Sequence, residues 1–541
     1  MSKQAVGSVL VVDAAVLTMD EARPRAEAFL VTDGVVSAVG TSAELRTLAP
    51  TTPVLDAGGR TVLPGLTDAH AHLELLAYAW HIAVDCRSPR VRSIEDIVAL
   101  LRERADRCAP GEWILGHGGH FQDATLAERR YPDRRDLDRV SLEHPVVFRS
   151  SYHSNVFNSK ALELLGVDRD TPDAPGGRIE HDEHGEPTGR TYDMYGELGV
   201  PEAPLDELAR AITAIEDSYL AYGVTAFGDI PLHPNGLAAL AALAADGLLR
   251  TRVVAYPKHP NVVAPADLRS GALVAALPPD DGRLRLGGVK VFLDGGLTSS
   301  AAALHEPYEG QGTYAGELAF SPEELRELAE QVDAAGLQLS LHAIGDRALD
   351  IAIDAIASLP RDRVRTAGHR IEHAGNLFMT PERIARILDA EIVAVPQPAF
   401  LLTTAAGYRR LLGPERSADL MPFRRLLDAG LVLPGNSDAI GITSGQHNPF
   451  PGMRAAVDRR TAEGDLIDPE QAITPEEALA MYTTGAAAAI GEAAQRGSIS
   501  VGKAGDFIVL DRDPLADDGA QLAAVRVDET WIGGRRVFRR D

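Results

Sequence analysis

Histidines and a carboxylate recur at the ends of apolar runs in this chain. The first such run ends with His70 and His72, and residues two apart on a strand face the same side, so both imidazoles can converge on one point. Later runs end at His342, His373 and Asp438. Histidine and carboxylate together are typical ligands of zinc, manganese and iron. We therefore predict a metal site built from these five side chains.

Lys290 lies inside another apolar run, GGVKVFLDGG. Burying a free ammonium group is costly, and only five of the 53 basic residues in this chain are lysines. The choice of lysine favours a reactive amine, because a neutral amine can combine with CO₂ into a carbamate that bridges two metal ions. The alternative is a lysine that extends to solvent or pairs with Asp294.

The elements that position these groups alternate between strand and helix patterns. Serine or threonine followed by proline and glutamate predicts helix starts at Ser321, Thr380 and Thr474. The first of these helices is expected to run to about Ala335 and end at Gly336. Apolar β-type runs lie near residues 61–68, 224–228, 251–256, 287–293, 338–343, 367–373, 391–396 and 431–436.

Eight strands alternating with helices indicate an α/β protein with a (β/α)₈ TIM-like barrel, whose active site lies at the carboxyl ends of the strands. A doubly wound sheet is the alternative, but no Gly-rich dinucleotide or phosphate loop follows an early strand. The ends of the chain read as short strands with turns, which predicts one composite β-sandwich domain. The expected domains are 1–63 (first part of the sandwich), 64–494 (the barrel, with an inserted subdomain at about 74–200) and 495–541 (second part).

Composition narrows the possible partners. The 53 basic and 78 acidic side chains give a net charge of −25, which argues against binding nucleic acid or an anionic membrane. No apolar run approaches the roughly 18–20 residues that span a bilayer, and no signal peptide is recognised at the N-terminus. Cys86 and Cys108 are too few for a disulfide scaffold, although one bridge between them stays open. A cytoplasmic location is expected.

The same residues resemble a known family. The order D-x-H-x-H, K, H, H, D on successive strands is similar to that of the amidohydrolase superfamily. Further motifs resemble its amidohydrolase family 3 branch, which includes N-substituted formamide deformylase, and the resemblance covers nearly the whole chain. The motifs are VLPGLTDAHAHL, HSNVFNSKAL, VKVFLDGG, LHAIGDRALD, RIEHAG, VPQPAF, GNSDA and GSISVGKAGDFIVLD.

This resemblance implies a role for each predicted ligand. His70 and His72 would hold a first divalent metal, and His342 and His373 a second. Lys290, as a carbamate, would bridge the two ions. Zn²⁺ is the expected metal, with Mn²⁺, Co²⁺ and Fe²⁺ as alternatives, and a single-metal site stays open. Asp438 would bind the first metal and serve as the catalytic acid and base.

The resemblance also places His153, Asp294 and Gln397 near the site, where they would bind the substrate; ordinary loop or supporting hydrogen bonds are the alternative for each. His117 and His120 stand where relatives often carry a Gly-Trp-Asp pattern, so the identity of the substrate does not transfer from those relatives.

The implied function is hydrolysis of a non-peptide C–N bond, in an N-substituted amide or formamide, by a metal-activated hydroxide. Hydrolysis of a cyclic amide, carbamate or ester at the same centre is an alternative. A metal-free homologue acting as a binding or scaffold protein is the contrasting class. The expected partner is a small-molecule substrate, with no nucleic acid and no membrane, and a homodimer is left open.

Overall fold

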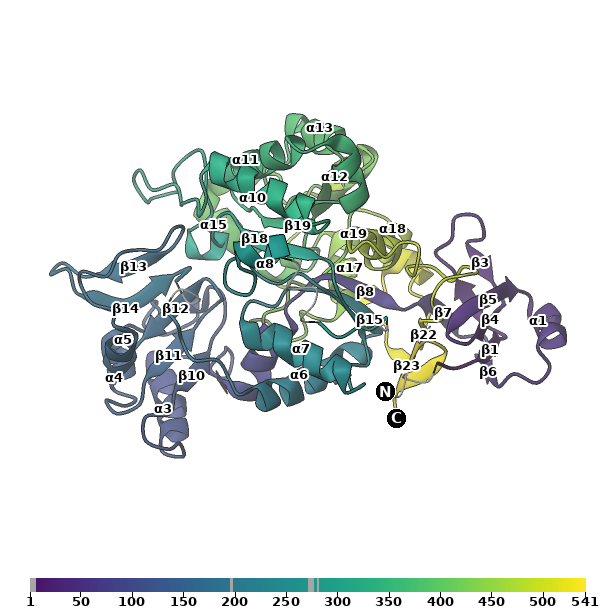
Figure 1. The fold of residues 1–541 in the computed structure, drawn as a ribbon, viewed down its shortest axis with the longest axis horizontal. Coiled ribbons are helices and arrows are strands. Elements are labelled where there is room, and N and C mark those ends of the chain that lie inside the picture. Colours follow the sequence, from purple (N-terminus) through teal and green to yellow (C-terminus); the bar gives the residue numbers. More distant parts are fainter. Residues whose placement is uncertain (1–5, 195–197, 271–276, 280–281) are drawn as a thin grey trace.

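The computed structural model describes residues 6–194, 198–270, 277–279 and 282–541, and these residues have an α/β fold (Figure 1). Parallel strands and their helices occupy the centre of the view. Strands from both ends of the chain lie together on the right, and strands between residues 84 and 192 lie on the left.

Eight parallel strands form two four-stranded sheets, in the orders β17-β16-β15-β8 and β18-β19-β20-β21. Their bounds are β8 (Leu66–Ala71), β15 (Val224–Asp229), β16 (Arg252–Ala255), β17 (Leu284–Leu286), β18 (Gly288–Phe292), β19 (Gln338–His342), β20 (Arg370–Glu372) and β21 (Val393–Val395). The chain just beyond β16 continues along β18, because His259 N–H donates to Lys290 O at 2.8 Å. The two sheets are therefore joined by backbone hydrogen bonds.

One predicted barrel strand was wrong and one strand was not predicted. Residues 431–436 form no regular strand, because Pro434 has no N–H to donate and Gly435 N–H donates to Met481 O at 2.7 Å instead of to a neighbouring strand. The short strand β17 lies just before the predicted run 287–293 and was too brief to show a periodicity of its own.

The predicted helix starts are confirmed. The side chains of Ser321, Thr380 and Thr474 each accept a hydrogen bond from the backbone N–H of the third helical residue, with proline at the first position. The helix after Ser321 ends at Ala334, and Gly336 has φ of +70°, as the glycine stop predicts.

Helices connect the parallel strands and cover them. The helices between and after these strands are α2 (Leu73–Ala77), α6 (Leu205–Leu220), α7 (Pro234–Ala245), α8 (Pro265–Ser270), α10 (Pro322–Ala334), α11 (Asp346–Ala357), α12 (Arg361–Ala367), α13 (Pro381–Asp389), α14 (Phe400–Thr403), α15 (Ala405–Arg416), α16 (Phe423–Asp428), α17 (Pro449–Asp458), α18 (Pro475–Ala480) and α19 (Ala486–Ala489). Their apolar faces and the strands share one large buried core.

The two ends of the chain build two further sheets, in the orders β5-β4-β1-β6 and β24-β23-β22-β7-β2-β3. The strands are β1 (Val9–Val12), β2 (Ala15–Leu17), β3 (Arg25–Ala26), β4 (Ala28–Thr32), β5 (Val35–Gly40), β6 (Val54–Asp56), β7 (Thr61–Pro64), β22 (Phe507–Leu510), β23 (Val527–Ile532) and β24 (Arg535–Arg539), with helix α1 (Ser42–Leu48) after β5. Phe29 of the first sheet packs against Phe507 of the second, with ring centroids 5.0 Å apart. One core therefore contains residues from both termini.

Two glycine-containing turns near the ends of the chain make hairpins. Asp33-Gly34 joins β4 to β5, and Gly533-Gly534 joins β23 to β24. Gly58-Gly59 does not make a hairpin, because β6 and β7 belong to different sheets. The run predicted at 61–68 is likewise split, with β7 in a terminal sheet and β8 in a parallel one.

A six-stranded sheet with the order β13-β14-β12-β11-β10-β9 lies between β8 and β15 in the sequence. Its elements are β9 (Val84–Asp85), α3 (Ile94–Ala105), β10 (Ile114–His117), α4 (Arg134–Asp138), β11 (Val146–Arg149), β12 (Ser154–Phe157), α5 (Ser159–Leu165), β13 (Arg178–His181) and β14 (Pro187–Tyr192). Cys86 and Cys108, whose pairing the sequence left open, are both free thiols. Among the described residues, no helix combines the length and the apolar character needed to cross a bilayer.

Candidate metal centre

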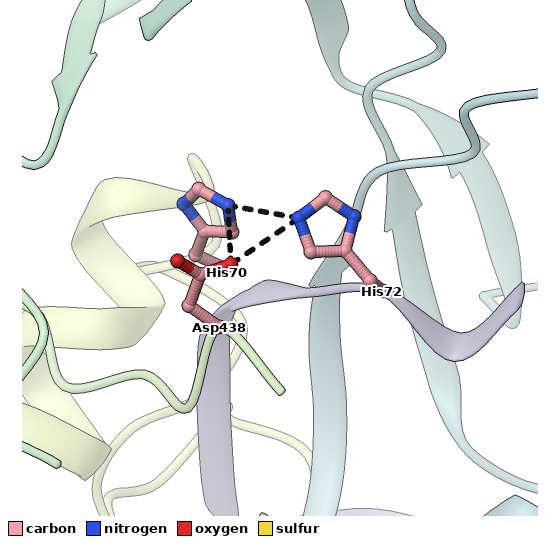
Figure 2. Close-up of side chains that lie close together, drawn as sticks. All are labelled: His70, His72 and Asp438. Atoms are coloured by element: carbon pink, nitrogen blue, oxygen red, sulfur yellow. Dashed lines mark hydrogen bonds and ion pairs between the residues drawn. The ribbon is translucent and has the colours of Figure 1, made fainter. Parts of the chain in front are cut away.

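His70, His72 and Asp438 converge on one point (Figure 2). His70 lies near the end of β8 and His72 just beyond it, so their rings point to the same side. Their Nε2 atoms are 3.2 Å apart, and Asp438 Oδ1 lies 3.4 Å from the first and 3.3 Å from the second. Asp438 N–H donates to His70 O at 3.0 Å, so a backbone bond holds the carboxylate segment beside β8.

The hydrogen-bond partners of the two rings define which nitrogens carry protons. His70 Nδ1 is 2.7 Å from a carboxylate oxygen of Glu372, and His72 Nδ1 is 3.2 Å from Ile230 O. Both oxygens are acceptors, so both Nδ1 atoms donate and both Nε2 atoms present lone pairs to Asp438. Burial lowers the pKa of His70 to about 4, which keeps the ring neutral near pH 7.

Three electron-pair donors thus face one another with no proton between them. An ionised Asp438 directs one carboxylate oxygen at both Nε2 atoms. Such an arrangement is repulsive unless a cation neutralises it, and two imidazoles with a carboxylate are suitable ligands for a divalent metal. The residues present fit a metal ion.

His342 and His373 make a second pair beside the first. His373 Nε2 is 3.1 Å from His342 Nδ1, and the ring centroids of His70 and His373 are 5.6 Å apart. Gln397 accepts from His373 Nδ1 at 2.8 Å, because its own amide nitrogen donates to Val395 O. His373 therefore presents a lone pair on Nε2, as a metal ligand requires.

Lys290 is fully buried, and its Nζ has no hydrogen-bond partner among the described residues. Burial lowers the pKa of this amine to about 8, although Glu372 and Asp438 act in the opposite direction. The alternative of a lysine that reaches solvent is wrong, since the side chain is 0% exposed. A pair with Asp294 is also absent among the described residues. A buried amine with a lowered pKa has the neutral fraction that carbamate formation requires.

The predicted substrate residues fall into two groups. His153 lines the cavity that contains the candidate metal-ligand side chains, and its Nδ1 is bonded to the Asp193 carboxylate. Asp294 and Gln397 do not line that cavity. Gln397 supports His373, and Asp294 accepts three backbone N–H bonds, from Ala303, Ile344 and Gly345. Their contacts favour supporting roles, and substrate binding by them stays a prediction.

Two predicted ligands have unusual backbone conformations. His373 has φ of +72° and Asp438 has φ of +45°. Positive φ is uncommon for residues other than glycine, and it persists only where the surrounding structure imposes it. Positive φ also occurs at other non-glycine residues of the chain, and here it accompanies two of the predicted ligands.

Two residues at this centre were not predicted as site residues. Glu372 is fully buried beside His70, and its charge next to Arg370 in the short strand β20 was the available signal. Burial opposes ionisation of Glu372, but Arg370 and His70 hold its pKa well below the usual range. His120 lines the cavity, and its Nε2 is buried with no hydrogen-bond partner among the described residues.

The sequence profile of the Amidohydrolase family matches residues 53–538. The chain belongs to the amidohydrolase family. This amidohydrolase is 30% identical over 543 residues to an N-substituted formamide deformylase of Arthrobacter pascens, with 98% of each chain covered. It is 30% identical to the protein LONG AFTER FAR-RED 3 of Arabidopsis thaliana, across 98% of this chain and 92% of that protein.

A solved structure is similar over nearly the same length. An uncharacterized metal-dependent hydrolase from Pyrococcus horikoshii matches the amidohydrolase with a TM-score of 0.75 and 26% identity, covering 95% of this chain and 99% of that one. The family match, the similar solved structure and the geometry of His70, His72 and Asp438 support the same conclusion. The amidohydrolase is a metal-dependent hydrolase that acts on carbon–nitrogen bonds.

Proposed function

We propose that the amidohydrolase cleaves the C–N bond of an N-substituted amide or formamide. The observation that carries the proposal is the convergence of His70, His72 and Asp438, with lone pairs and a carboxylate facing one point. The relative from Arthrobacter pascens, which is described as an N-substituted formamide deformylase, supports this choice of substrate class.

In this proposal the ligands divide between two ions. His70, His72 and Asp438 would hold the first divalent metal, and His342 and His373 would hold the second. Lys290, as a carbamate, would be a ligand shared by the two ions, which its burial and lowered pKa support. Zinc suits the nitrogen-rich ligands best, and manganese, cobalt and iron are the alternatives. A single ion on the first three ligands is the simpler variant.

The chemistry is then divided between metal and protein. A bound divalent metal acidifies water and polarises a carbonyl oxygen. Asp438 accepts the proton that the attacking water loses and delivers it to the amide nitrogen as the C–N bond breaks. The products are a carboxylic acid and an amine. Glu372 holds the His70 ring in place throughout, and Gln397 does the same for His373.

The fold proposed for this chemistry is one (β/α)₈ barrel, of which the two parallel sheets are arcs. Support comes from the backbone bonds at the Lys258 and Lys290 bridge, and from Ala69 N–H donating to Gly435 O at 3.1 Å. The two terminal sheets, which share a core, form a composite β-sandwich from residues 1–63 and 495–541. The sheet of β9–β14 is the subdomain inserted at about 74–200 in the barrel domain, residues 64–494.

The test is a hydrolase screen with the metal content measured first. Purified protein is analysed for transition metals, then assayed on N-formyl and N-acyl amines with added zinc, manganese or cobalt. Release of amine that depends on the metal supports the proposal. Turnover only of cyclic amides, carbamates or esters would redirect the substrate class. A protein that binds no transition metal and hydrolyses nothing in the screen would instead be a scaffold or binding protein.

A further inference from the structure

A second cavity adjoins the metal centre. It has a volume of about 340 Å³, and Lys258, Asp193 and Phe320 are among its lining residues. Tyr152 and Phe292 line both this cavity and the one that holds the metal ligands. Their rings stack with centroids 5.9 Å apart. The two cavities therefore meet along one aromatic wall.

Lys258 provides the positive charge in this second cavity. It follows β16 and forms an isolated parallel bridge with Lys290 of β18, so two of the five lysines in the chain are neighbours across this bridge. The Phe292 ring centroid is 4.8 Å from Lys290 Nζ and 5.6 Å from Lys258 Nζ. Both amines therefore lie close to one aromatic ring.

The ammonium of Lys258 has no carboxylate partner among the described residues. Its Nζ donates to Tyr152 Oη at 3.3 Å, and its other close neighbours are the faces of Tyr152 and Phe292. Lys160, by contrast, pairs with Glu163 at 2.8 Å. A half-buried ammonium with spare donors beside a cavity is suited to an anionic ligand.

None of the acidic residues that line the cavity forms an ion pair with Lys258 in the described part of the chain. Asp193 is bonded to His153, Asp294 accepts three backbone N–H groups, and Glu324 caps helix α10 through Ser321. Each carboxylate is therefore held by a group other than Lys258. The charge of Lys258 remains available to a ligand.

We propose that this cavity is a subsite for a carboxylate group of the substrate. Lys258 binds the carboxylate, and the apolar part of the substrate between the carboxylate and the amide packs against Tyr152 and Phe292. The inference rests on the proposed function and adds to it a substrate class: an N-substituted amide or formamide that also has a carboxylate several bonds from the scissile carbonyl. In this proposal the amide lies at the metal ligands, and the carboxylate lies in the second cavity beside Lys258.

The kinetic test compares matched substrates. N-formyl-ω-amino acids of increasing chain length are compared with the corresponding N-formyl-ω-amino amides, in which an uncharged amide replaces the carboxylate. Each pair is assayed with wild-type protein, Lys258→Met, Lys258→Arg and the control Lys160→Met. Wild-type protein should prefer the acid at one chain length by at least about tenfold in kcat/KM, since a charge-assisted hydrogen bond has that strength. Lys258→Met should abolish the preference, Lys258→Arg should restore part of it, and Lys160→Met should leave it unchanged.

A binding measurement separates failure of this inference from failure of the proposed function. Phenylacetate and phenylacetamide are titrated calorimetrically into zinc-loaded wild-type and Lys258→Met protein. Phenylacetate bound only to the metal would be insensitive to Lys258→Met, whereas binding in the second cavity should weaken at least about tenfold. Equal binding by both proteins, or equal loss of acid and amide turnover in Lys258→Met, would overturn the subsite. Absence of any hydrolysis would count against the proposed function, and Lys258-dependent binding would still support the subsite.

Discussion

His70 donates its Nδ1 proton to Glu372 across 2.7 Å, although the two residues are 302 positions apart in the chain. This bond holds the imidazole in one orientation and leaves the Nε2 lone pair facing Asp438. Ser340 donates to the other carboxylate oxygen of Glu372 at 2.6 Å, and Arg370 also bonds to it. A buried carboxylate that accepts hydrogen bonds from His70, Ser340 and Arg370 thus positions a proposed metal ligand.

Replacing Glu372 by glutamine should weaken metal binding without removing a ligand. The neutral amide is a poorer acceptor for His70 Nδ1–H, and partners of this kind typically change metal affinity about 10- to 100-fold. The dissociation constant for zinc, measured by competition with a chromogenic chelator, checks this. Glu323→Gln on the exposed start of α10 is the control. An unchanged zinc affinity in a folded Glu372→Gln protein would contradict the positioning role.

Asp438→Asn should abolish most hydrolysis while the fold persists. Asparagine keeps the shape of the side chain but cannot accept the proton of water and return it to the leaving nitrogen. We expect a fall in kcat of about 100- to 10,000-fold, the usual contribution of general acid–base catalysis. Steady-state kinetics on the best substrate of the screen, with thermal unfolding as the fold check, measure this. Normal turnover by the variant would contradict the assignment of Asp438 as the general acid and base.

Lys290→Ala should lose activity and partly regain it with a short carboxylic acid. The truncation leaves space where an added carboxylate can supply the oxygen atoms of the proposed carbamate. A loss of about 100-fold or more is expected, because in the proposed two-metal site both ions would lose a shared ligand. Assays with increasing formate, acetate and propionate show whether activity returns. Lys503→Ala is the control, since Lys503 O accepts from Val36 N–H of the terminal strand β5 at 2.8 Å. Full activity of Lys290→Ala without any acid would rule out a bridging lysine.

Asp506→Asn should destabilise the junction between the terminal sheets and the parallel sheet. Asp506 pairs with Arg252 of β16 at 2.7 Å and accepts from Gly533 N–H at 2.8 Å. Burial alone would raise the pKa of Asp506, but Arg252 and Arg496 lower it to about 2. Because this value lies below the unfolded pKa of about 3.9, ionised Asp506 stabilises the fold by about 2–3 kcal/mol at neutral pH.

Because the pKa of Asp506 is lower in the folded than in the unfolded state, its stabilising contribution depends on pH. The contribution is fully present above pH 4 and is lost as pH falls from about 4 towards 2. Urea unfolding of wild-type and Asp506→Asn protein across this range should show a free-energy difference that shrinks on acidification. Asp528→Asn removes a more exposed pair with Arg60 and should cost under about 1 kcal/mol. A difference that grows at low pH would contradict the assignment.

Local patterns were sufficient for the ligand types and several elements. The spacing of His70 and His72 on a strand, and the positions of His342 and His373 at strand ends, followed from side-chain alternation. The caps at Ser321 and Thr474 followed from short-range hydrogen bonding. Each of these features depends on residues a few positions apart, which is why the sequence predicts them.

Other features depend on partners distant in the chain. Residues 431–436 have the composition of a strand, but Gly435 bonds to Met481, and a ladder does not form. Gln397 and Asp294 carry polar groups that suit a substrate, yet their neighbours in space are His373 and backbone amides. Composition shows what a side chain is able to bind, and only the packed chain selects the partner.

The sequence by itself therefore determined the kind of chemistry: histidines, a lysine and an aspartate in the order of the amidohydrolase family. The tertiary structure decided which nitrogen of each ring faces the centre, which carboxylate supports it, and that Lys258 lies beside a second cavity. The physical reason is the distance along the chain over which each interaction acts. Periodicity and capping act along a few residues, whereas proton positions and unpaired charges are settled by hydrogen bonds between segments that meet only when the chain folds.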